Sequence, residues 1–195
     1  METAVRFGPE YYRRYYGSGR MAVTSRPEMA RRGEFIAGFA RYLDPPIRSI
    51  LDAGCGMGWL RAPLRRRFPR ARYVGLDLSP YLCRRFGWLQ GSVATHRPRT
   101  PYDLVICYDV LQYLDDREAR RAVSNLARIT RAVLYFSALT REDWEQHCDQ
   151  SCADGEVFLR PAAWYRERLS RSFLALGGGM HLKRGVVAPL WELER

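Results

Sequence analysis

Short apolar runs alternate with amphipathic helical patterns along most of this chain. Continuous apolar stretches occupy about residues 47–54, 71–79, 102–110 and 132–139, and helix-type spacing fills the intervals. Strands that are apolar throughout belong to a parallel sheet with both faces covered. The alternation therefore predicts an α/β fold with a doubly wound, mostly parallel sheet.

The segments between the apolar stretches are expected to form the helices that cover the sheet. Pro9 begins a short helix carrying a tyrosine stripe, and a longer helix is expected over about residues 27–43. The expected buried face of the longer helix comprises Phe35, Ile36, Phe39 and Leu43. Further helices are expected over residues 59–68, 80–86, 115–131 and 161–171.

The last third of the chain has a different character. Residues 140–160 read as a segment inserted after the fifth strand. In the middle of the chain, a weak strand is expected at 88–90. Residues 172–178 and 186–194 read as two strands joined by GGGMHLKRG. We expect the second, at residues 187–192, to be a reversed C-terminal strand at the sheet edge. One domain over residues 1–195 is predicted, with an N-terminal helical cap over about 9–43.

Composition supports a globular cytoplasmic domain. The chain has 195 residues, of which 47% are hydrophobic and 27% are charged. No N-terminal signal core or membrane-length apolar run is present. The five cysteines are an odd number at scattered spacings, which favours reduced thiols over a disulfide framework.

Glycine occupies alternate positions directly after the first predicted strand, in LDAGCGMGWL (residues 51–60). Asp52 ends the apolar run, and Gly54, Gly56 and Gly58 follow. Glycines at the carboxyl end of a strand allow a sharp turn and let a ligand lie against backbone N–H groups. A nicotinamide fingerprint needs glycine three residues after Gly56, where this chain has Trp59. The spacing therefore argues against a dinucleotide site.

Two further motifs help to interpret the glycine loop. YVGLDLSP (residues 73–80) puts Asp77 at the end of the second strand, where a carboxylate can accept both ribose hydroxyls. YDLVICYDVLQYLDD (residues 102–116) forms the next long strand and its turn. Together the three stretches resemble the class I S-adenosylmethionine (SAM)-dependent methyltransferases over about residues 48–138. The last motif matches at Asp103, Val105, Val110, Leu111 and Leu114.

The resemblance implies a seven-stranded sheet and a cofactor site. The glycine loop would line the methionine part of SAM, Asp77 would bind the ribose, and residues after the fourth strand would face the sulfonium. Ser92 stands where the family commonly has an acid, so the adenine contact would rest on groups near Ser92 and Val93. The predicted cofactor residues are Asp52, Gly54, Cys55, Gly56, Asp77, Leu78, Ser79, Ser92, Val93, Tyr108, Asp109, Tyr12 and Tyr16.

The tyrosine stripe of the first helix allows two interpretations. Tyr12, Tyr15 and Tyr16 would close over SAM, because aromatic faces favour a cationic centre. Alternatively, the stripe simply packs an amphipathic helix against the body of the domain.

Methyl transfer from a sulfonium depends mainly on placing the acceptor in line, and a base is needed only if the acceptor loses a proton. Tyr113 and His147 are the predicted catalytic residues, with Asp109 and Asp143 as further candidates. His147 lies in the inserted segment, where this family often builds its acceptor pocket. The alternative is an ordinary surface histidine, which is also our expectation for His96 and His181.

No metal site is predicted. His147, Cys148 and Cys152 form an H-C-x₃-C pattern in which two side chains could share a metal. No second cluster completes a set of four ligands.

The formal charge of +11 comes almost entirely from arginine, since Lys183 is the only lysine. This skew is typical of a GC-rich genome, and the arginines lie where solvated helix faces are expected, as in residues 60–72. Solvated surface therefore explains the charge better than a nucleic-acid partner.

The sequence thus predicts an enzyme that transfers a methyl group from SAM to a small-molecule acceptor, leaving S-adenosylhomocysteine (SAH). ICYDVLQYL has no Asn-Pro-Pro-Tyr-type signature of amino or base methylation. The alternatives are an RNA or protein methyltransferase that uses the arginine surface, and a non-catalytic SAM-binding partner protein.

Overall fold

The computed structural model describes residues 7–17, 23–150 and 154–194. The strands are β1 Ser49–Ala53, β2 Arg72–Asp77, β3 Leu89–Gln90, β4 Tyr102–Tyr108, β5 Thr130–Ser137, β6 Phe173–Gly177 and β7 Met180–Lys183. The α-helices are α2 Pro9–Tyr16, α3 Arg26–Tyr42, α4 Arg61–Arg67, α5 Pro80–Phe86, α6 Asp116–Ile129, α7 Arg141–Gln146 and α8 Ala162–Ser170. Two 3₁₀ helices are η1 Leu111–Tyr113 and η2 Glu192–Glu194.

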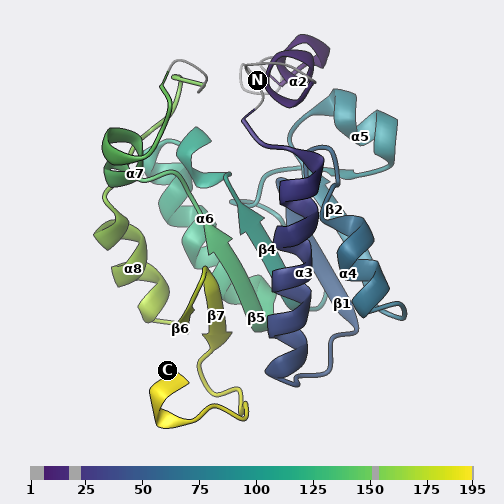
Figure 1. Ribbon diagram of the computed structural model, residues 1–195, viewed down its shortest axis with the longest axis vertical. Helices are drawn as coiled ribbons and strands as arrows, with labels where there is room; N and C mark the ends of the chain where they lie inside the picture. The colour runs from purple at the N-terminus through teal and green to yellow at the C-terminus, as the bar shows by residue number, and fades with distance from the viewer. Residues whose placement is uncertain (1–6, 18–22, 151–153, 195) are drawn as a thin grey trace.

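The strands form one seven-stranded sheet in the order β3-β2-β1-β4-β5-β7-β6 (Figure 1). Every neighbouring pair is parallel except the two that involve β7, which runs antiparallel to both β5 and β6. The predicted fold class is therefore confirmed. The strand order reverses between β1 and β4, and ligands of open parallel sheets bind at the carboxyl ends of the strands at such a point.

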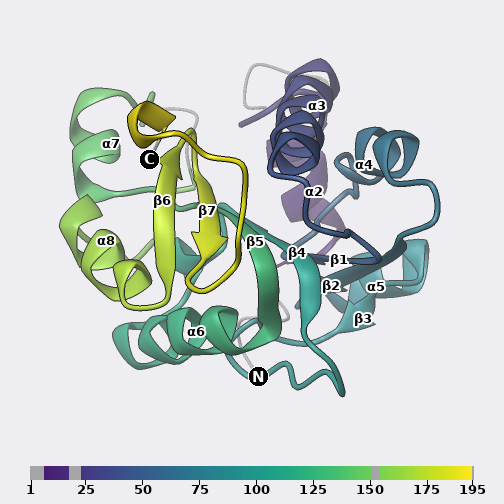
Figure 2. The same ribbon diagram turned by 90° about the horizontal axis from the view of Figure 1, so that it is seen from below.

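Helices cover both faces of the sheet. α3 and α4 lie on one side of it, whereas α6 and α8 lie on the other (Figure 2). Ile36 of α3 and Leu64 of α4 belong to a buried cluster with Ile50 and Ile106. Leu126 of α6 lies in the cluster on the opposite face. Because both faces of the sheet are buried, the strands carry apolar residues on both sides, and their sequences do not alternate between apolar and polar residues.

The buried face of α3 differs from the predicted one. Ile36 and Leu43 are buried as expected, but Phe35 is 43% exposed, so its place on the buried face was wrongly predicted. The helix instead approaches α4 closely: a Cβ at Gly33 would lie only 2.3 Å from Cγ of Pro63. Phe35 lies against the turn before β7 instead, where a Cβ at Gly178 would be 2.7 Å from its Cζ.

The reversed strand lies earlier in the chain than predicted. Gly177, Gly178 and Gly179 all have positive φ (87°, 55° and 83°), which gives a turn much tighter than the expected one. β7 begins directly after this turn, with Met180 and Leu182 buried. It lies between β5 and β6, so β6 forms the edge. Residues 187–191 form no strand, and the prediction for 187–192 is therefore wrong.

The buried acid of the β4 motif fastens the amino ends of two strands. Asp103 Oδ2 accepts hydrogen bonds from the N–H groups of Arg48 and Ser49, at 2.9 and 3.0 Å. Its other oxygen lies 2.7 Å from Nη1 of Arg131. Asp103 is 3% exposed and lies at the opposite end of the sheet from the strands' carboxyl ends. It therefore has a structural role.

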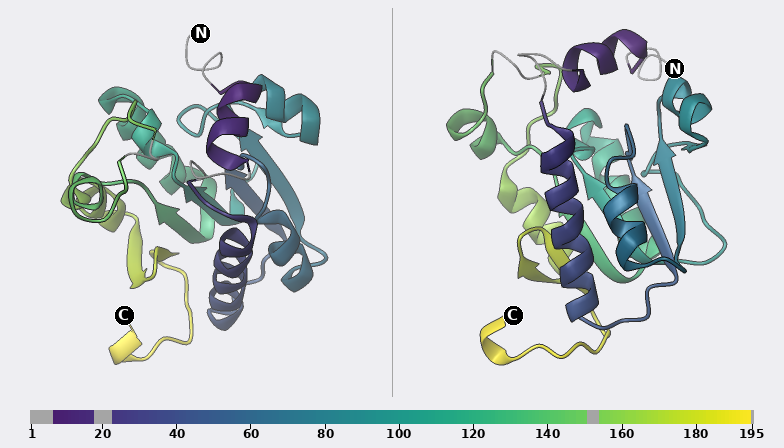
Figure 3. Two further views of the ribbon diagram at one scale, coloured as in Figure 1. Left: turned by 45° about the horizontal axis from the view of Figure 1, so that its top comes forward. Right: turned by 45° about the vertical axis from the view of Figure 1, so that its right-hand side comes forward.

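α2 lies over the end of the sheet at which the parallel strands have their carboxyl ends, close to α5 in Figure 1. Both views of Figure 3 place α2 at this end and the C-terminus at the opposite end. No helix in the described part of the chain is long and apolar enough to cross a membrane.

Candidate active site

A cavity opens beneath α2, at the carboxyl ends of β1, β2 and β4. It encloses about 610 Å³, part of which is open to solvent. The glycine loop, the ends of β2 and β4 and the tyrosines of α2 all contribute to its lining. The predicted cofactor residues that line it are Gly54, Gly56, Asp77, Leu78, Ser92, Val93, Asp109, Tyr12 and Tyr16.

A second cavity of about 590 Å³ adjoins the first, and it too includes open solvent. The two share Tyr16, Gly54, Gly56 and Asp109. The second cavity adds three further predicted residues, Asp52, Cys55 and Tyr108. Together the two cavities are lined by every predicted cofactor residue except Ser79.

The glycines of the loop are needed for two different reasons. Gly54 has φ 76°, and a Cβ there would lie 2.2 Å from Cγ2 of Val110, so the loop lies directly against the turn after β4. Gly56 has φ 50°, but a Cβ there would meet no atom within 4 Å. The missing side chain of Gly56 therefore leaves open space where the two cavities join.

Asp77 connects the end of β2 to the glycine loop. Its Oδ2 accepts the Gly56 N–H at 2.8 Å and its Oδ1 accepts the Ser79 N–H at 2.9 Å. Burial raises the pKa of this carboxyl, while these backbone donors oppose the rise. An ionised carboxylate has about four lone-pair sites, more than its backbone donors occupy, so acceptor capacity stays available for a ligand hydroxyl.

Ser79 lies behind the cavity wall rather than in it. Its side chain is fully buried and caps α5 by accepting the Leu82 N–H at 3.3 Å. Its hydroxyl donates to the Phe7 carbonyl at 2.6 Å, which fixes the segment leading into α2. Leu78 lines the first cavity instead. Ser79 therefore shapes the site through Phe7, whose ring is part of the lining.

Asp52 is a buried acid at the end of β1. Its Oδ2 accepts the Tyr73 hydroxyl at 2.5 Å, and the residue is 3% exposed. Burial raises the pKa of Asp52 to about 7, against the lowering effect of the Tyr73 hydrogen bond. The carboxyl is thus poised to ionise when a positive charge enters the second cavity.

Asp109 occupies a strained backbone position directly after β4. Its φ is 54°, a left-handed conformation that is uncommon for a residue other than glycine. Burial raises the pKa of Asp109 to about 6, although hydrogen bonds from Tyr108 and Gln112 and the charge of Arg32 oppose the rise. The strain and the perturbed acidity coincide where both cavities meet, a combination found at functional sites.

The tyrosines of α2 form part of the roof. Tyr11, Tyr12 and Tyr16 line the first cavity, and the Tyr11 hydroxyl lies 3.1 Å from that of Tyr113. Burial raises the pKa of Tyr12 and Tyr16, which stay neutral at physiological pH. Tyr15 lines neither cavity, and the Arg14 guanidinium lies over its ring.

Ser92 and Val93, in the turn after β3, line the first cavity. The Ser92 hydroxyl accepts the Ala94 N–H at 3.1 Å, which shapes the turn after β3. The Val93 carbonyl accepts the buried Asn125 Nδ2 at 2.7 Å. This turn is therefore held in place by α6.

Only one of the two predicted catalytic residues lies in the site. Tyr113 lines the first cavity. His147 is exposed at the end of α7 and lines neither cavity. Asp143 is engaged in a capping box with Thr140 at the start of α7. His96 and His181 are half-buried, so their predicted surface positions are wrong: His96 packs on Tyr102, and His181 lies in β7.

Arg32 of α3 was not identified from the sequence. Its guanidinium lies 4.2 Å from the centre of the Tyr108 ring, and Nη1 donates to the Tyr135 hydroxyl at 2.8 Å. Its Nε is buried without a hydrogen-bond partner among the described residues. An arginine in an arginine-rich helix carries no distinguishing pattern, so only the packing of α3 against β4 and β5 shows its position.

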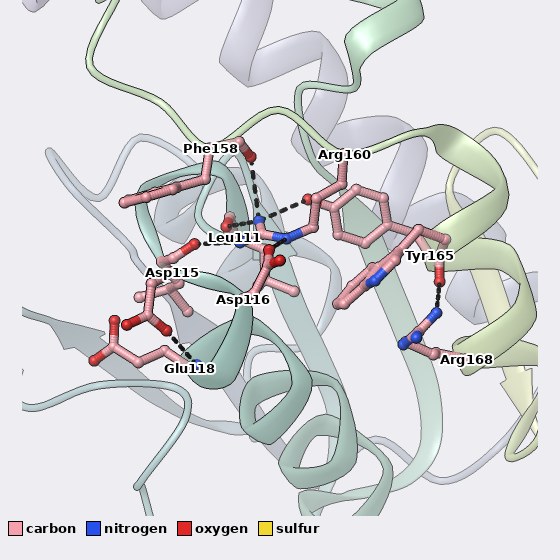
Figure 4. Close-up of polar contacts among 10 residues, drawn as sticks. Leu111, Asp115, Asp116, Glu118, Phe158, Arg160, Tyr165 and Arg168 are labelled. Atoms are coloured by element: carbon pink, nitrogen blue, oxygen red, sulfur yellow. Dashed lines mark hydrogen bonds and ion pairs between the residues drawn. The ribbon is translucent and has the colours of Figure 1, made fainter.

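Arg160 was also not identified, although it braces the turn that carries Tyr113 (Figure 4). The side chain is 4% exposed, and Nε lies 2.9 Å from Asp116 Oδ1. Nη1 donates to the Leu111 carbonyl at 3.0 Å and Nη2 to the Leu114 carbonyl at 2.5 Å. The Arg160 guanidinium, at the last residue of the segment at 140–160, thus holds both ends of η1.

No group of three or more metal-ligating side chains occurs in the ranges that the structure describes. Cys152, part of the H-C-x₃-C pattern, lies outside those ranges. Cys55, Cys83 and Cys107 are buried free thiols, and Cys148 is half-buried.

The residues of the two cavities fit SAM. The open space at Gly56 would accept a ligand lying against the loop backbone. Asp52 and Asp109 are buried carboxyls with raised pKa, and a sulfonium and an ammonium group would favour their charged forms. Asp77 has free acceptor capacity for a ribose hydroxyl, and the aromatic roof suits a cationic ligand.

Comparison with known proteins agrees with this geometry. Residues 50–132 match the family described as methyltransferase domain. Trans-aconitate 2-methyltransferase of Azoarcus sp. (strain BH72) is 35% identical over 75 residues, which cover 35% of this chain and 30% of that protein. Malonyl-[acyl-carrier protein] O-methyltransferase of Hahella chejuensis is 31% identical over 103 residues, covering 45% and 34%. The chain thus matches about a third of the length of these relatives.

Among solved structures, magnesium protoporphyrin IX methyltransferase from Synechocystis PCC 6803 with bound SAM superimposes with a TM-score of 0.59. The match covers 93% of this chain and 95% of that one at 20% identity. It shows a shared fold over nearly the whole of both chains. With the match of residues 50–132 to the methyltransferase domain family and the reversed β7, the chain has the fold of the class I SAM-dependent methyltransferases.

Proposed function

We propose that this chain binds SAM in the two joined cavities and transfers its methyl group to a small-molecule acceptor. One observation carries the proposal: the glycine loop and Asp109 line both cavities at the point where the strand order of the sheet reverses. When bound, SAM supplies an activated methyl group on a sulfonium.

The residues of the chain have distinct tasks in this proposal. Asp77 would accept the ribose hydroxyls, while Gly56 keeps its place in the loop open for the ligand. Ser92 and Val93 would meet the adenine through backbone groups. Asp52 and Asp109 would stabilise positive charge on the ligand, which is most effective in a buried site that excludes water.

The acceptor side of the site offers two polar side chains. Asp109 and Tyr113 both line the first cavity near the roof formed by α2. If the acceptor must lose a proton, Asp109 is the better base, since a carboxyl with a pKa of about 6 is ionised at neutral pH and still basic. Tyr113 would then orient the acceptor. His147 has no place in this proposal, because it lies outside both cavities.

A small acceptor is favoured over RNA or protein by two observations. The tyrosines of α2 roof the first cavity. The relative from Azoarcus sp. named above acts on trans-aconitate, a small molecule, according to its name. Two alternatives remain open: methylation of RNA or protein, and SAM binding without transfer.

Labelled-methyl transfer distinguishes these alternatives. The purified chain is incubated with methyl-labelled SAM and fractionated extract, and label is measured in small metabolites, RNA and protein. Label in small metabolites, lost in a Gly56→Val variant, is the expected result. Label in RNA or protein instead would refute the small-molecule assignment. SAH binding without any label transfer would leave only the non-catalytic alternative.

A further inference from the structure

A groove lined mainly by arginines lies at α6, with no lining residue in common with the two cavities. It encloses about 580 Å³, including open solvent, and is lined by Arg97, Arg120, Arg121, Ser124, Asn125 and Arg128. Arg97 follows the turn after β3, and the others belong to α6. None of these four arginines forms an ion pair with a carboxylate of the described residues.

Two guanidinium groups converge on one uncharged oxygen in this groove. Arg97 Nη1 donates to Asn125 Oδ1 at 2.7 Å. Arg128 donates to the same oxygen through Nε at 3.1 Å and Nη2 at 2.8 Å. An amide oxygen satisfies hydrogen bonds but does not neutralise two positive charges, so their mutual repulsion is left uncompensated.

The fold holds this pair in position. Asn125 is 3% exposed, and its Nδ2 donates to the carbonyls of Val93 and His96, at 2.7 and 2.9 Å. Arg128 Nη2 also donates to the His96 carbonyl, at 3.1 Å. Burial and the charges of Arg128 and Arg97 lower the pKa of His96, which keeps that ring neutral beside them. The positive charge is therefore concentrated on the arginines.

The arginines of α4 provide a contrast. Arg66 forms an ion pair with Glu34, and Arg61 lies over the rings of Tyr73 and Trp88. Arg65 and Arg67 are exposed on the same helix. The groove at α6 thus differs from this ordinary arginine surface in the convergence of two cations on a single neutral group.

We propose that the groove binds a phosphate group between Arg97 and Arg128. The planar fork of a guanidinium matches two phosphate oxygens, and a doubly charged anion would neutralise both converging cations. Arg120, Arg121 and Ser124 line the same groove and supply further donors. A phosphorylated small molecule and the backbone of RNA both present this chemical group.

Nuclear magnetic resonance of the ¹⁵N-labelled chain tests the site directly. Inorganic phosphate is titrated at constant ionic strength while the Asn125 side-chain amide and the His96 backbone amide are followed. Saturable shifts of both signals are expected. Arg97→Gln/Arg128→Gln should weaken binding by at least about tenfold, because charge-assisted hydrogen bonds are lost. Arg65→Gln/Arg67→Gln removes the same net charge from α4 and should leave binding unchanged.

A second variant guards against misfolding of the first. Ser124→Glu places a carboxylate in the groove while all four arginines stay, so it should abolish the phosphate shifts in a folded chain. Shifts that do not saturate, or that persist equally in this variant and in Arg97→Gln/Arg128→Gln, would overturn the proposal.

A short single-stranded RNA added to the phosphate-bound chain separates the two sources. Displacement of phosphate from the same signals, with strong salt dependence, assigns the groove to a nucleic-acid backbone. Phosphate binding that RNA does not displace assigns it to a phosphorylated small molecule. Either result supports the phosphate site, and neither depends on methyl transfer.

Discussion

The Gly56 N–H donates to Asp77 Oδ2 over 2.8 Å, which joins the turn after β1 to the end of β2. The acid proposed to bind the ribose therefore also sets the shape of the loop proposed to hold the methionine part. A substitution of Asp77 changes both, and the choice of substitution decides which effect is measured.

Asp77→Asn is expected to weaken SAH binding by about tenfold or more, since a hydrogen bond to a charged group contributes about 1.5–3 kcal/mol. The amide has nearly the same shape but only one acceptor oxygen, so it also loses one of the two backbone hydrogen bonds, from Gly56 or from Ser79. Calorimetric titration with SAH measures the effect. Asp103→Asn is the matched control: this acid is also buried, at the far end of the sheet, and its loss should lower stability without changing SAH affinity. Unchanged affinity in Asp77→Asn would give Asp77 a structural role only.

The pKa of Asp52, raised by burial to about 7, predicts a pH-dependent stability. The folded chain holds this proton more tightly than the unfolded chain, whose aspartates titrate near pH 4. The free energy of unfolding should therefore fall as pH rises from about 4 through 7, by a few kcal/mol at most. Urea unfolding between pH 4.5 and 8 measures the slope, which Asp52→Asn should reduce. An identical slope in the variant would mean that Asp52 does not cause it.

Ligand binding should have the opposite pH dependence at the same residue. A cationic ligand favours ionised Asp52 and Asp109, so SAM should bind more tightly as pH rises from 5.5 to 8 and should release protons on binding. Calorimetry in buffers of different ionisation enthalpy counts those protons. Proton uptake instead of release would contradict the assignment of these acids to the cationic part of the ligand.

Arg160→Met should lower the free energy of unfolding by about 3 kcal/mol or more, because it removes the buried, charge-assisted hydrogen bonds that the guanidinium donates to the carbonyls of Leu111 and Leu114. Arg160→Lys should recover only part of this loss, since an ammonium group cannot reach both ends of η1 with planar geometry. Arg168→Met is the control, as Arg168 is more exposed and donates to a carbonyl of its own helix (Figure 4). Equal losses in the two methionine variants would show that Arg160 has no special role.

Tyr113→Phe should reduce label transfer by about tenfold or more if the hydroxyl orients the acceptor, with SAH affinity nearly unchanged. Tyr11→Phe removes the same hydrogen bond, between hydroxyls 3.1 Å apart, from the other side. Comparing the two variants separates chemistry from packing of the roof. A matching loss in Tyr11→Phe would attribute the effect to the position of α2.

The sequence predicted the parts of this fold that rest on local pattern. The buried strands, α5 and the glycine loop follow from short runs of residues whose chemistry leaves few alternatives. β7 was missed because MHLK is only four residues long and follows three glycines, which made the whole stretch resemble a turn. Its strand character depends on pairing with β5, a partner more than forty residues away.

The residues of the candidate site likewise include some that the sequence could predict and some that it could not. The acids and glycines at strand ends could be placed from sequence, since the carboxyl ends of parallel strands meet at one edge. Arg32, Arg160 and Asn125 could not, because each acts on backbone or rings from a different element. His147 lines neither cavity, and the path of the segment at 140–160, which decides this, cannot be read from its composition.

Calorimetric titration of the chain and of two glycine variants with SAH tests the central claim most directly. Gly56 and Gly87 both have positive φ and open space around an added Cβ, but only Gly56 lines the cavities. Alanine at either position costs similar backbone strain, roughly 1 kcal/mol. We expect one SAH to bind to the unaltered chain and to Gly87→Ala, greatly weakened binding to Gly56→Ala, and no binding of NAD. Absence of SAH binding by the unaltered chain, or equal binding by Gly56→Ala, would contradict this claim.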